Sequence, residues 1–194
     1  MNSKNNSANK IFTVPNFLSL VRLLLIPIIV WLYCIKKEYV LTAVILVVSG
    51  VTDVVDGFIA RHFGLVSNLG KALDPVADKL TQLATLFCLV TRFHLMAIPI
   101  VLMFIKETIV GVTGLLVIKK TGIVCGADWH GKLTTVLLYG MIMLHIVWYN
   151  INNVASNITI AVCTAMMFLS LCLYVYRNIS LIREKSKDKA NKAL

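Results

Sequence analysis

Four aspartates stand in or beside long apolar runs of the sequence, where an unpaired charge is costly. They lie within TDVVDGFIARHFGLVSNLGKALDPVADKLTQ, residues 52–82, at positions Asp53, Asp56, Asp74 and Asp78. A charged side chain at the centre of a membrane helix costs roughly 2.5–3.5 kcal/mol on insertion scales. Their presence therefore calls for a partner that offsets this cost.

The spacing of the aspartates gives each pair a shared helix face. Asp53 and Asp56 are three residues apart, and Asp74 and Asp78 are four apart. In a helix, residues at these separations lie on the same side. The segment between the pairs is short enough to turn the chain and lay two helices antiparallel. The two pairs can then face one another near the cytoplasmic ends of their helices.

Four carboxylates that converge in a poorly solvated place repel one another unless cations sit between them. Oxygen ligands without a nearby His or Cys indicate Mg²⁺, Mn²⁺ or Ca²⁺ rather than zinc. Two closely spaced ions suit a phosphoryl-type transfer, where they neutralise diphosphate charge. The alternative is a set of salt bridges to Arg61, Lys71 and Lys79, which can pair the four anions only in part.

The rest of the sequence predicts an all-α, polytopic membrane protein with one domain. Of its 194 residues 58% are apolar and only 14% are charged, a composition unlike that of soluble domains. Six apolar windows are each long enough to span hydrocarbon about 30 Å thick. They fall at about Phe17–Ile35, Tyr39–Ala60, Ala72–Thr91, His94–Ile118, Leu133–Asn150 and Ile158–Tyr176.

The distribution of Lys and Arg predicts the orientation of these spans. Thirteen lie in the terminal segments and in the second and fourth connections, whereas the other connections carry three. By the positive-inside rule, both termini and the active site face the cytoplasm of a multi-pass cell-membrane protein. The domains expected are a cytoplasmic segment 1–16, a six-helix catalytic domain 17–176 and a basic tail 177–194. The tail is interpreted as a topology signal that contacts anionic membrane lipids.

Composition also argues against other function classes. The net charge of +10 is explained by the basic residues expected on the cytoplasmic side. The sequence has no basic patch interleaved with aromatic residues, which nucleic-acid binding would favour. The five cysteines are scattered without a C-x-x-C pair, so we expect neither a disulfide framework nor a zinc site. A small cation transporter remains an alternative from another class. It would require mid-membrane carboxylates and an inverted repeat, but the aspartates cluster towards one face.

The aspartates belong to a longer pattern that resembles a known family. Asp53-x-x-Asp56-Gly57-x-x-Ala60-Arg61, then eight residues, then Gly70-x-x-x-Asp74-x-x-x-Asp78 matches the signature of the CDP-alcohol phosphatidyltransferases at every fixed position. The segment Pro15–Arg22, PNFLSLVR, is similar to the PNxLTxxR with which these enzymes often begin. The resemblance implies their six-helix membrane fold and, as is usual among them, a homodimer.

The resemblance also implies a reaction and a set of site residues. In this family a CDP-linked lipid, usually CDP-diacylglycerol, gives its phosphatidyl group to an alcohol and releases CMP. The implied ligands for two Mg²⁺ or Mn²⁺ ions are Asp53, Asp56, Asp74 and Asp78. Asp78 is also implied as the general base on the acceptor hydroxyl. The residues implied to hold CDP are Gly57, Arg61, Ser67 and Gly70, with Asn16, Ser19 and Arg22 at the nucleotide end.

The acceptor is suggested by a likeness to the phosphatidylglycerophosphate synthases of the family. They tend to carry Arg-Glu where this chain has Lys106-Glu107, and GKxKT where it has GKLTT, with Thr134 replacing a Lys. The likeness favours glycerol 3-phosphate; a cardiolipin synthase that uses phosphatidylglycerol is the runner-up, and inositol phosphate and serine stay open. The residues expected to bind the acceptor are Lys106, Glu107, Lys119 and Lys132.

Simpler roles stand beside these assignments. For Lys119, a positive-inside topology charge explains the residue as well as acceptor binding does. Lys106 is interpreted equally well as the partner of Glu107 within its own helix. His130 is expected to be an interfacial residue without a role in the reaction.

Overall fold

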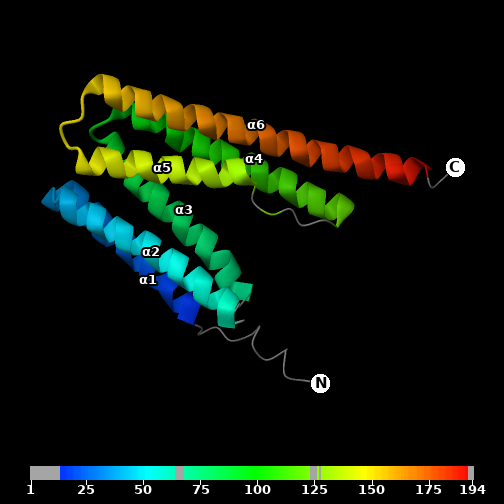
Figure 1. The fold of residues 1–194 in the computed structure, drawn as a ribbon, viewed down its shortest axis with the longest axis horizontal. Coiled ribbons are helices and arrows are strands. Elements are labelled where there is room, and N and C mark those ends of the chain that lie inside the picture. The colour runs from blue at the N-terminus through cyan, green and yellow to red at the C-terminus, as the bar shows by residue number, and fades with distance from the viewer. Residues whose placement is uncertain (1–13, 64–67, 123–125, 127, 192–194) are drawn as a thin grey trace. The chain divides into compact units, whose positions relative to one another are not determined.

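The computed structural model describes residues 14–63, 68–122, 126 and 128–191, with side chains over 18–52, 74–122, 126 and 128–185. Every regular element in this part of the chain is a helix (Figure 1). The elements are α1 (Val14–Val30), the π-helix η1 (Trp31–Lys36), α2 (Tyr39–Phe63), α3 (Asn68–Val90), the 3₁₀-helix η2 (His94–Met96), α4 (Ala97–Thr121), α5 (Trp129–Val147) and α6 (Asn153–Asn191).

The chain forms two compact units, which are described separately. The first contains Met1–Phe93 together with Ile142–Asn150, so it holds α1, η1, α2, α3 and the end of α5. The second contains His94–Met141 and Ile151–Leu194, and thus η2, α4, most of α5, and α6.

In the first unit, α1 packs against both α2 and α3 (Figure 1). Small side chains are buried on all three helices, among them Ser19 on α1, Ala43 on α2 and Ala77 on α3. Small residues let membrane helices approach closely, and van der Waals packing then holds them together. This packing is what brings side chains of α1 to the face of α3 that carries the aspartates.

Aromatic and basic side chains gather where η1 and α3 end and α2 begins. Tyr39 contacts the rings of both Tyr33 and Tyr149, at centroid distances of 5.2 and 4.6 Å. The Arg92 guanidinium lies 3.5 Å from the centre of the Tyr149 ring. Such rings are enriched at membrane–water interfaces. Asp74 lies sixteen residues before the end of α3, or about 24 Å along a helix, so the aspartates are near the opposite end of α3.

In the second unit, α4 and α6 lie side by side along most of their length (Figure 1). The buried Asn178 amide of α6 donates to the Thr113 hydroxyl of α4 at 2.8 Å. Gly122 ends α4 in the left-handed conformation, with φ of 74°, which costs glycine little. α6 has 39 residues, about 58 Å, and is longer than a bilayer core is thick. The segment predicted as a basic tail is therefore helical as far as Asn191.

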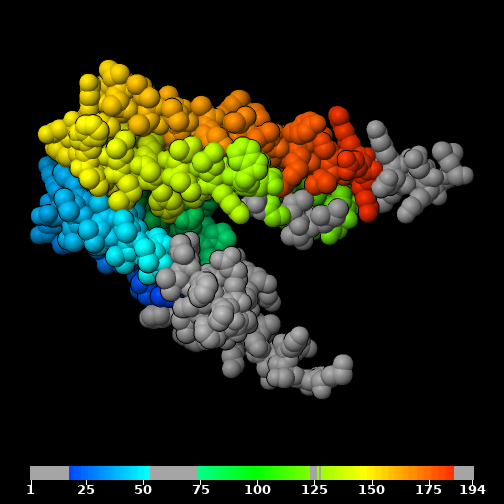
Figure 2. All heavy atoms as spheres, viewed as in Figure 1, coloured from blue at the N-terminus to red at the C-terminus, as the bar shows by residue number. Residues whose placement is uncertain are grey.

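Within the part of the chain that the structure describes, four helical segments are long and apolar enough to cross a membrane: Leu18–Lys36, His94–Thr121, Trp129–Val147 and Asn153–Lys185. Many large apolar side chains of these segments are exposed, which is expected of a surface that faces lipid. Figure 2 shows α6, in orange and red, along the surface of the second unit. Among the described residues, the second predicted window appears as a shorter apolar helix, Tyr39–Thr52. The all-α membrane class is thus supported, while the full count of six spans stays a prediction.

Candidate active site

Asp74 and Asp78 lie one turn apart on the same face of α3, as their spacing predicts. Both side chains are partly buried, and Ala77 between them is fully buried against the rest of the first unit. Pro75 follows Asp74 inside the helix and has no N–H to offer the carbonyl four residues earlier. The two carboxylates therefore lie one turn apart on the packed side of one helix.

The α1 helix contributes a hydroxyl to this face. The Ser19 hydroxyl donates a hydrogen bond to Oδ1 of Asp74, across 55 residues of sequence. Ser19 is fully buried, and Arg22, three residues later on the same helix, is 2% exposed. The predicted nucleotide-end residues Ser19 and Arg22 therefore lie in the core of the unit that holds the aspartates, and Ser19 touches one of them.

Gln82, which the sequence analysis did not single out, is joined to Asp78. Its side-chain amide donates to Oδ2 of Asp78 at 3.0 Å, and the residue is completely buried. Gln82 lies four residues after Asp78, so both sit on one face of α3. The i, i+4 spacing from Asp78 could have indicated Gln82 in the sequence, once Asp78 is considered a reacting group.

The other signature residues fall outside the described side chains. Asp53, Asp56, Gly57 and Arg61 lie along α2, and Gly70 lies in the first turn of α3, so their helical spacing agrees with the prediction. For these residues and Asn16 the structure describes the backbone alone, and Ser67 lies outside the described residues. Among the described side chains, no group of three or more His, Cys, Asp or Glu gathers. Asp53 and Asp56, two of the four predicted metal ligands, are not among these described side chains.

The predicted acceptor residues all belong to the second unit. Lys106 is 6% exposed, and its Nζ lies 3.5 Å from Oε1 of the neighbouring Glu107. Lys106 therefore has Glu107 as a partner within its own helix, as one of its two interpretations requires. Lys119, in the last turn of α4, and Lys132, in the first turn of α5, are both exposed. An exposed lysine is accessible to an anionic ligand and to lipid phosphate alike.

His130 is buried, whereas its expected place at the membrane interface stays a prediction. The residue is 4% exposed, with Nδ1 3.0 Å from the Ser170 hydroxyl and Nε2 3.2 Å from Oδ2 of Asp128. The same carboxylate oxygen accepts from Arg177 at 2.5 Å. These residues, together with Tyr174, form an anchor that ties the start of α5 to α6. The anchor was missed because Ser170, Tyr174 and Arg177 are at least 40 residues away in sequence.

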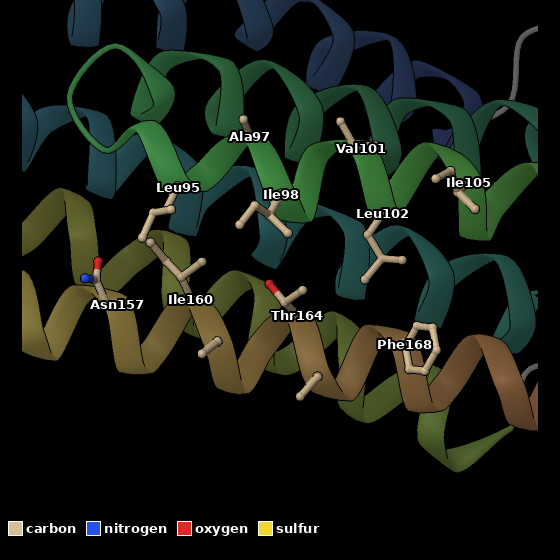
Figure 3. Close-up of a pocket in the computed structure, with 12 residues that line it drawn as sticks. Leu95, Ala97, Ile98, Val101, Leu102, Ile105, Asn157, Ile160, Thr164 and Phe168 are labelled. Carbon is tan, nitrogen blue, oxygen red and sulfur yellow. The ribbon is translucent and has the colours of Figure 1, made fainter.

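An open groove of about 880 Å³ runs between α4 and α6 in the second unit (Figure 3). Aliphatic side chains such as Ile98, Leu102 and Ile160 line it, and the polar exceptions are Asn157 and Thr164. No charged group lies along it. A diphosphate or a metal ion needs charged or hydrogen-bonding partners, so this groove is not the candidate active site.

Comparison with known proteins agrees with the signature. Residues 12–179 match the sequence profile of the family described as CDP-alcohol phosphatidyltransferase. The chain belongs to the CDP-alcohol phosphatidyltransferase family. The matched region covers every described element from α1 to the membrane part of α6, so the family assignment applies to the membrane domain as a whole.

Several relatives within the family carry one name, CDP-diacylglycerol--glycerol-3-phosphate 3-phosphatidyltransferase. The Bacillus subtilis protein is 35% identical over 152 residues, covering 69% of this chain and 78% of its own length. The Blochmanniella floridana protein is 28% identical over 183 residues, covering 89% and 94%. The Rickettsia typhi protein is 35% identical over 99 residues, so the match spans 50% of this chain and 56% of that relative.

A relative with another name matches a shorter part of this chain. It is a cardiolipin synthase (CMP-forming)/mitochondrial hydrolase fusion protein from Schizosaccharomyces pombe, 45% identical over 82 residues. The match covers 42% of this chain and only 14% of that protein.

Proposed function

We propose that this protein transfers the phosphatidyl group of CDP-diacylglycerol to glycerol 3-phosphate and releases CMP. The observation that carries the proposal is the complete aspartate signature, whose described half, Asp74 and Asp78, lies on one packed face of α3. The choice of glycerol 3-phosphate is supported by the names of relatives that match up to 89% of this chain. The basic side chains of Lys106, Lys119 and Lys132 also suit an acceptor that carries a phosphate.

In the proposed reaction, Asp78 accepts the proton of the acceptor hydroxyl. The alcohol oxygen then forms a bond to the phosphorus that carries the diacylglycerol group, while the bond between that phosphorus and the CMP oxygen breaks. A positioned carboxylate contributes typically 10²–10⁴-fold to a rate by such proton transfer. Ser19 orients Asp74 through its hydroxyl, and Arg61 is proposed to neutralise the diphosphate.

The residues fit a pair of divalent cations. Aspartate oxygens are the ligands that Mg²⁺ and Mn²⁺ prefer, and Asp74 and Asp78 supply them from consecutive turns of one helix. The proposed ligand set is completed by Asp53 and Asp56 of α2. When bound, the ions neutralise charge on the diphosphate and on the departing CMP.

The site is proposed to lie near the cytoplasmic face of a six-span homodimer. The aspartates are near the end of α3 that lies away from the aromatic residues Tyr33, Tyr39 and Tyr149. The excess of Lys and Arg in the terminal segments supports a cytoplasmic orientation. Such a position suits a substrate whose tails stay in lipid while its nucleotide reaches water.

The proposed function is tested with the purified full chain in detergent, given CDP-diacylglycerol and Mg²⁺ or Mn²⁺. CMP release is followed as each candidate alcohol is added in turn. We expect release that depends on glycerol 3-phosphate. Release only with phosphatidylglycerol, inositol phosphate or serine would keep the reaction and change the acceptor.

A result of no CMP with any alcohol and either metal would contradict the proposed function. In that case the cation transporter would be tested next, by measuring ion flux into vesicles that contain the protein.

A further inference from the structure

We propose that Gln82 is a positioning residue that fixes the orientation of Asp78, the residue proposed to take the proton of the acceptor alcohol. The inference rests on the proposed function, because it assigns a role within that reaction. The side-chain amide of Gln82 donates a hydrogen bond to Oδ2 of Asp78. Gln82 lies outside the family signature, which assigns it no role.

The geometry supports a fixed orientation for Asp78. Nε2 of Gln82 lies 3.0 Å from Oδ2, a normal hydrogen-bond length for an amide donor. Gln82 is completely buried, and its neighbours Thr81 and Leu86 are also buried, so its side chain has little freedom to leave this position. A carboxylate held through one oxygen cannot rotate freely about its last bond.

The chemistry of a carboxyl group allows this contact to persist through a proton transfer. A protonated carboxyl has one carbonyl oxygen, which accepts hydrogen bonds, and one hydroxyl oxygen, which carries the hydrogen. The amide N–H₂ of Gln82 can donate to Oδ2 of a carboxylate, and also to Oδ2 of a carboxyl group in which Oδ2 is the carbonyl oxygen. Gln82 can therefore hold Asp78 both before and after the transfer.

The second polar atom of Gln82 argues against a purely structural role. Within the described part of the chain, Oε1 of Gln82 is buried and finds no hydrogen-bond donor. A buried acceptor without a donor costs stability. An apolar residue of similar size would avoid that cost on a helix whose next turn is already filled by Leu86 and Leu89. The contact with Asp78 gives a reason for Gln at this position.

The test replaces Gln82 with Met, which has similar length but no N–H donor. With CDP-diacylglycerol, glycerol 3-phosphate and Mg²⁺, we expect kcat of Gln82→Met to fall about tenfold while both KM values change less than about twofold. Substrate binding is spared because Gln82 orients a proton acceptor and holds no substrate. Gln82→Asn, which keeps an amide but is one methylene too short, is expected to show the same loss.

Thr85→Val is the matched control. Thr85 is 1% exposed, one turn closer to the end of α3, and its hydroxyl donates only to the Thr81 carbonyl of its own helix at 2.8 Å. We expect its kcat to match the wild type. Mn²⁺ binding, followed by electron paramagnetic resonance, and the melting temperature are measured for all variants. We expect the melting temperature to be unchanged by Gln82→Met.

The outcomes separate this inference from the proposed function. A wild type that releases CMP, with Gln82→Met and Gln82→Asn equal to it, would overturn the inference and leave the function intact. A loss in Gln82→Met that appears equally in KM, melting temperature or the Thr85→Val control would assign Gln82 a structural role and also overturn it. A wild type without turnover on any alcohol would instead refute the function.

Discussion

Replacing Asp78 with Asn is expected to abolish CMP release, lowering kcat by about 10²–10⁴-fold. The amide has the size of the carboxyl but cannot accept the proton of an alcohol at neutral pH. Its oxygen can still accept the hydrogen bond that Gln82 donates at 3.0 Å, so the packing of α3 should survive. The measurement is kcat in the CMP assay, alongside the melting temperature and elution volume of the same preparation.

The control for Asp78→Asn is Glu38→Gln, which removes the same charge at an exposed position outside the signature. We expect it to be fully active, because Glu38 precedes α2 at the end of the unit that carries the aromatic residues. Turnover by Asp78→Asn within tenfold of the wild type, in a folded preparation, would remove the general-base role from Asp78. The proton would then have to leave through another group, and the inference about Gln82 would fall with it.

The features of the site that could be predicted from sequence are those that depend on the spacing of residues a few positions apart. Asp74 and Asp78 are four residues apart, and helix geometry alone places them on one face. Charges in apolar runs are rare enough to attract attention without any structure. The same holds for Lys106 and Glu107, whose contact in the structure is between adjacent residues of one helix.

Contacts between helices could not be predicted in the same way. Nothing local indicates that Ser19 reaches Asp74, since the register between α1 and α3 depends on how small side chains of both helices fit. The burial of His130 was not predicted either. It is buried because α6 supplies Ser170 and the residue just before α5 is Asp128, which together satisfy both ring nitrogens.

The role of Gly131 could not be predicted from sequence either. The HGK triplet that contains it is not a phosphate-binding loop, because the upstream glycine of that motif is missing. In the structure the reason for glycine is steric. A Cβ at position 131 would meet the hydroxyl of Tyr174, and would lie 3.1 and 3.2 Å from Cζ and Cε2 of its ring.

Gly131→Ala is therefore expected to destabilise the protein. Tyr174 cannot simply move away, because its hydroxyl accepts from the backbone N–H of Asp128 at 3.1 Å and its ring packs 4.4 Å from that of His130. Overpacking of this kind costs roughly 1–3 kcal/mol. For a chain of this size we expect a fall in melting temperature of roughly 3–10 °C, measured as the monodisperse fraction left after heating in detergent.

Gly140→Ala is the matched control, since it makes the same change on the same helix where no heavy atom lies within 4 Å of the new Cβ. Alanine favours a helix over glycine by up to about 1 kcal/mol, so this variant should be as stable as the wild type or more so. Adding Tyr174→Phe sharpens the test. Alone it removes the acceptor for the Asp128 N–H and lowers stability, whereas in Gly131→Ala it removes the closest clash and should recover part of the loss. Equal melting temperatures for Gly131→Ala and Gly140→Ala would show that α6 does not press against the start of α5, and the anchor built on Asp128 and His130 would not be the contact that holds these helices together.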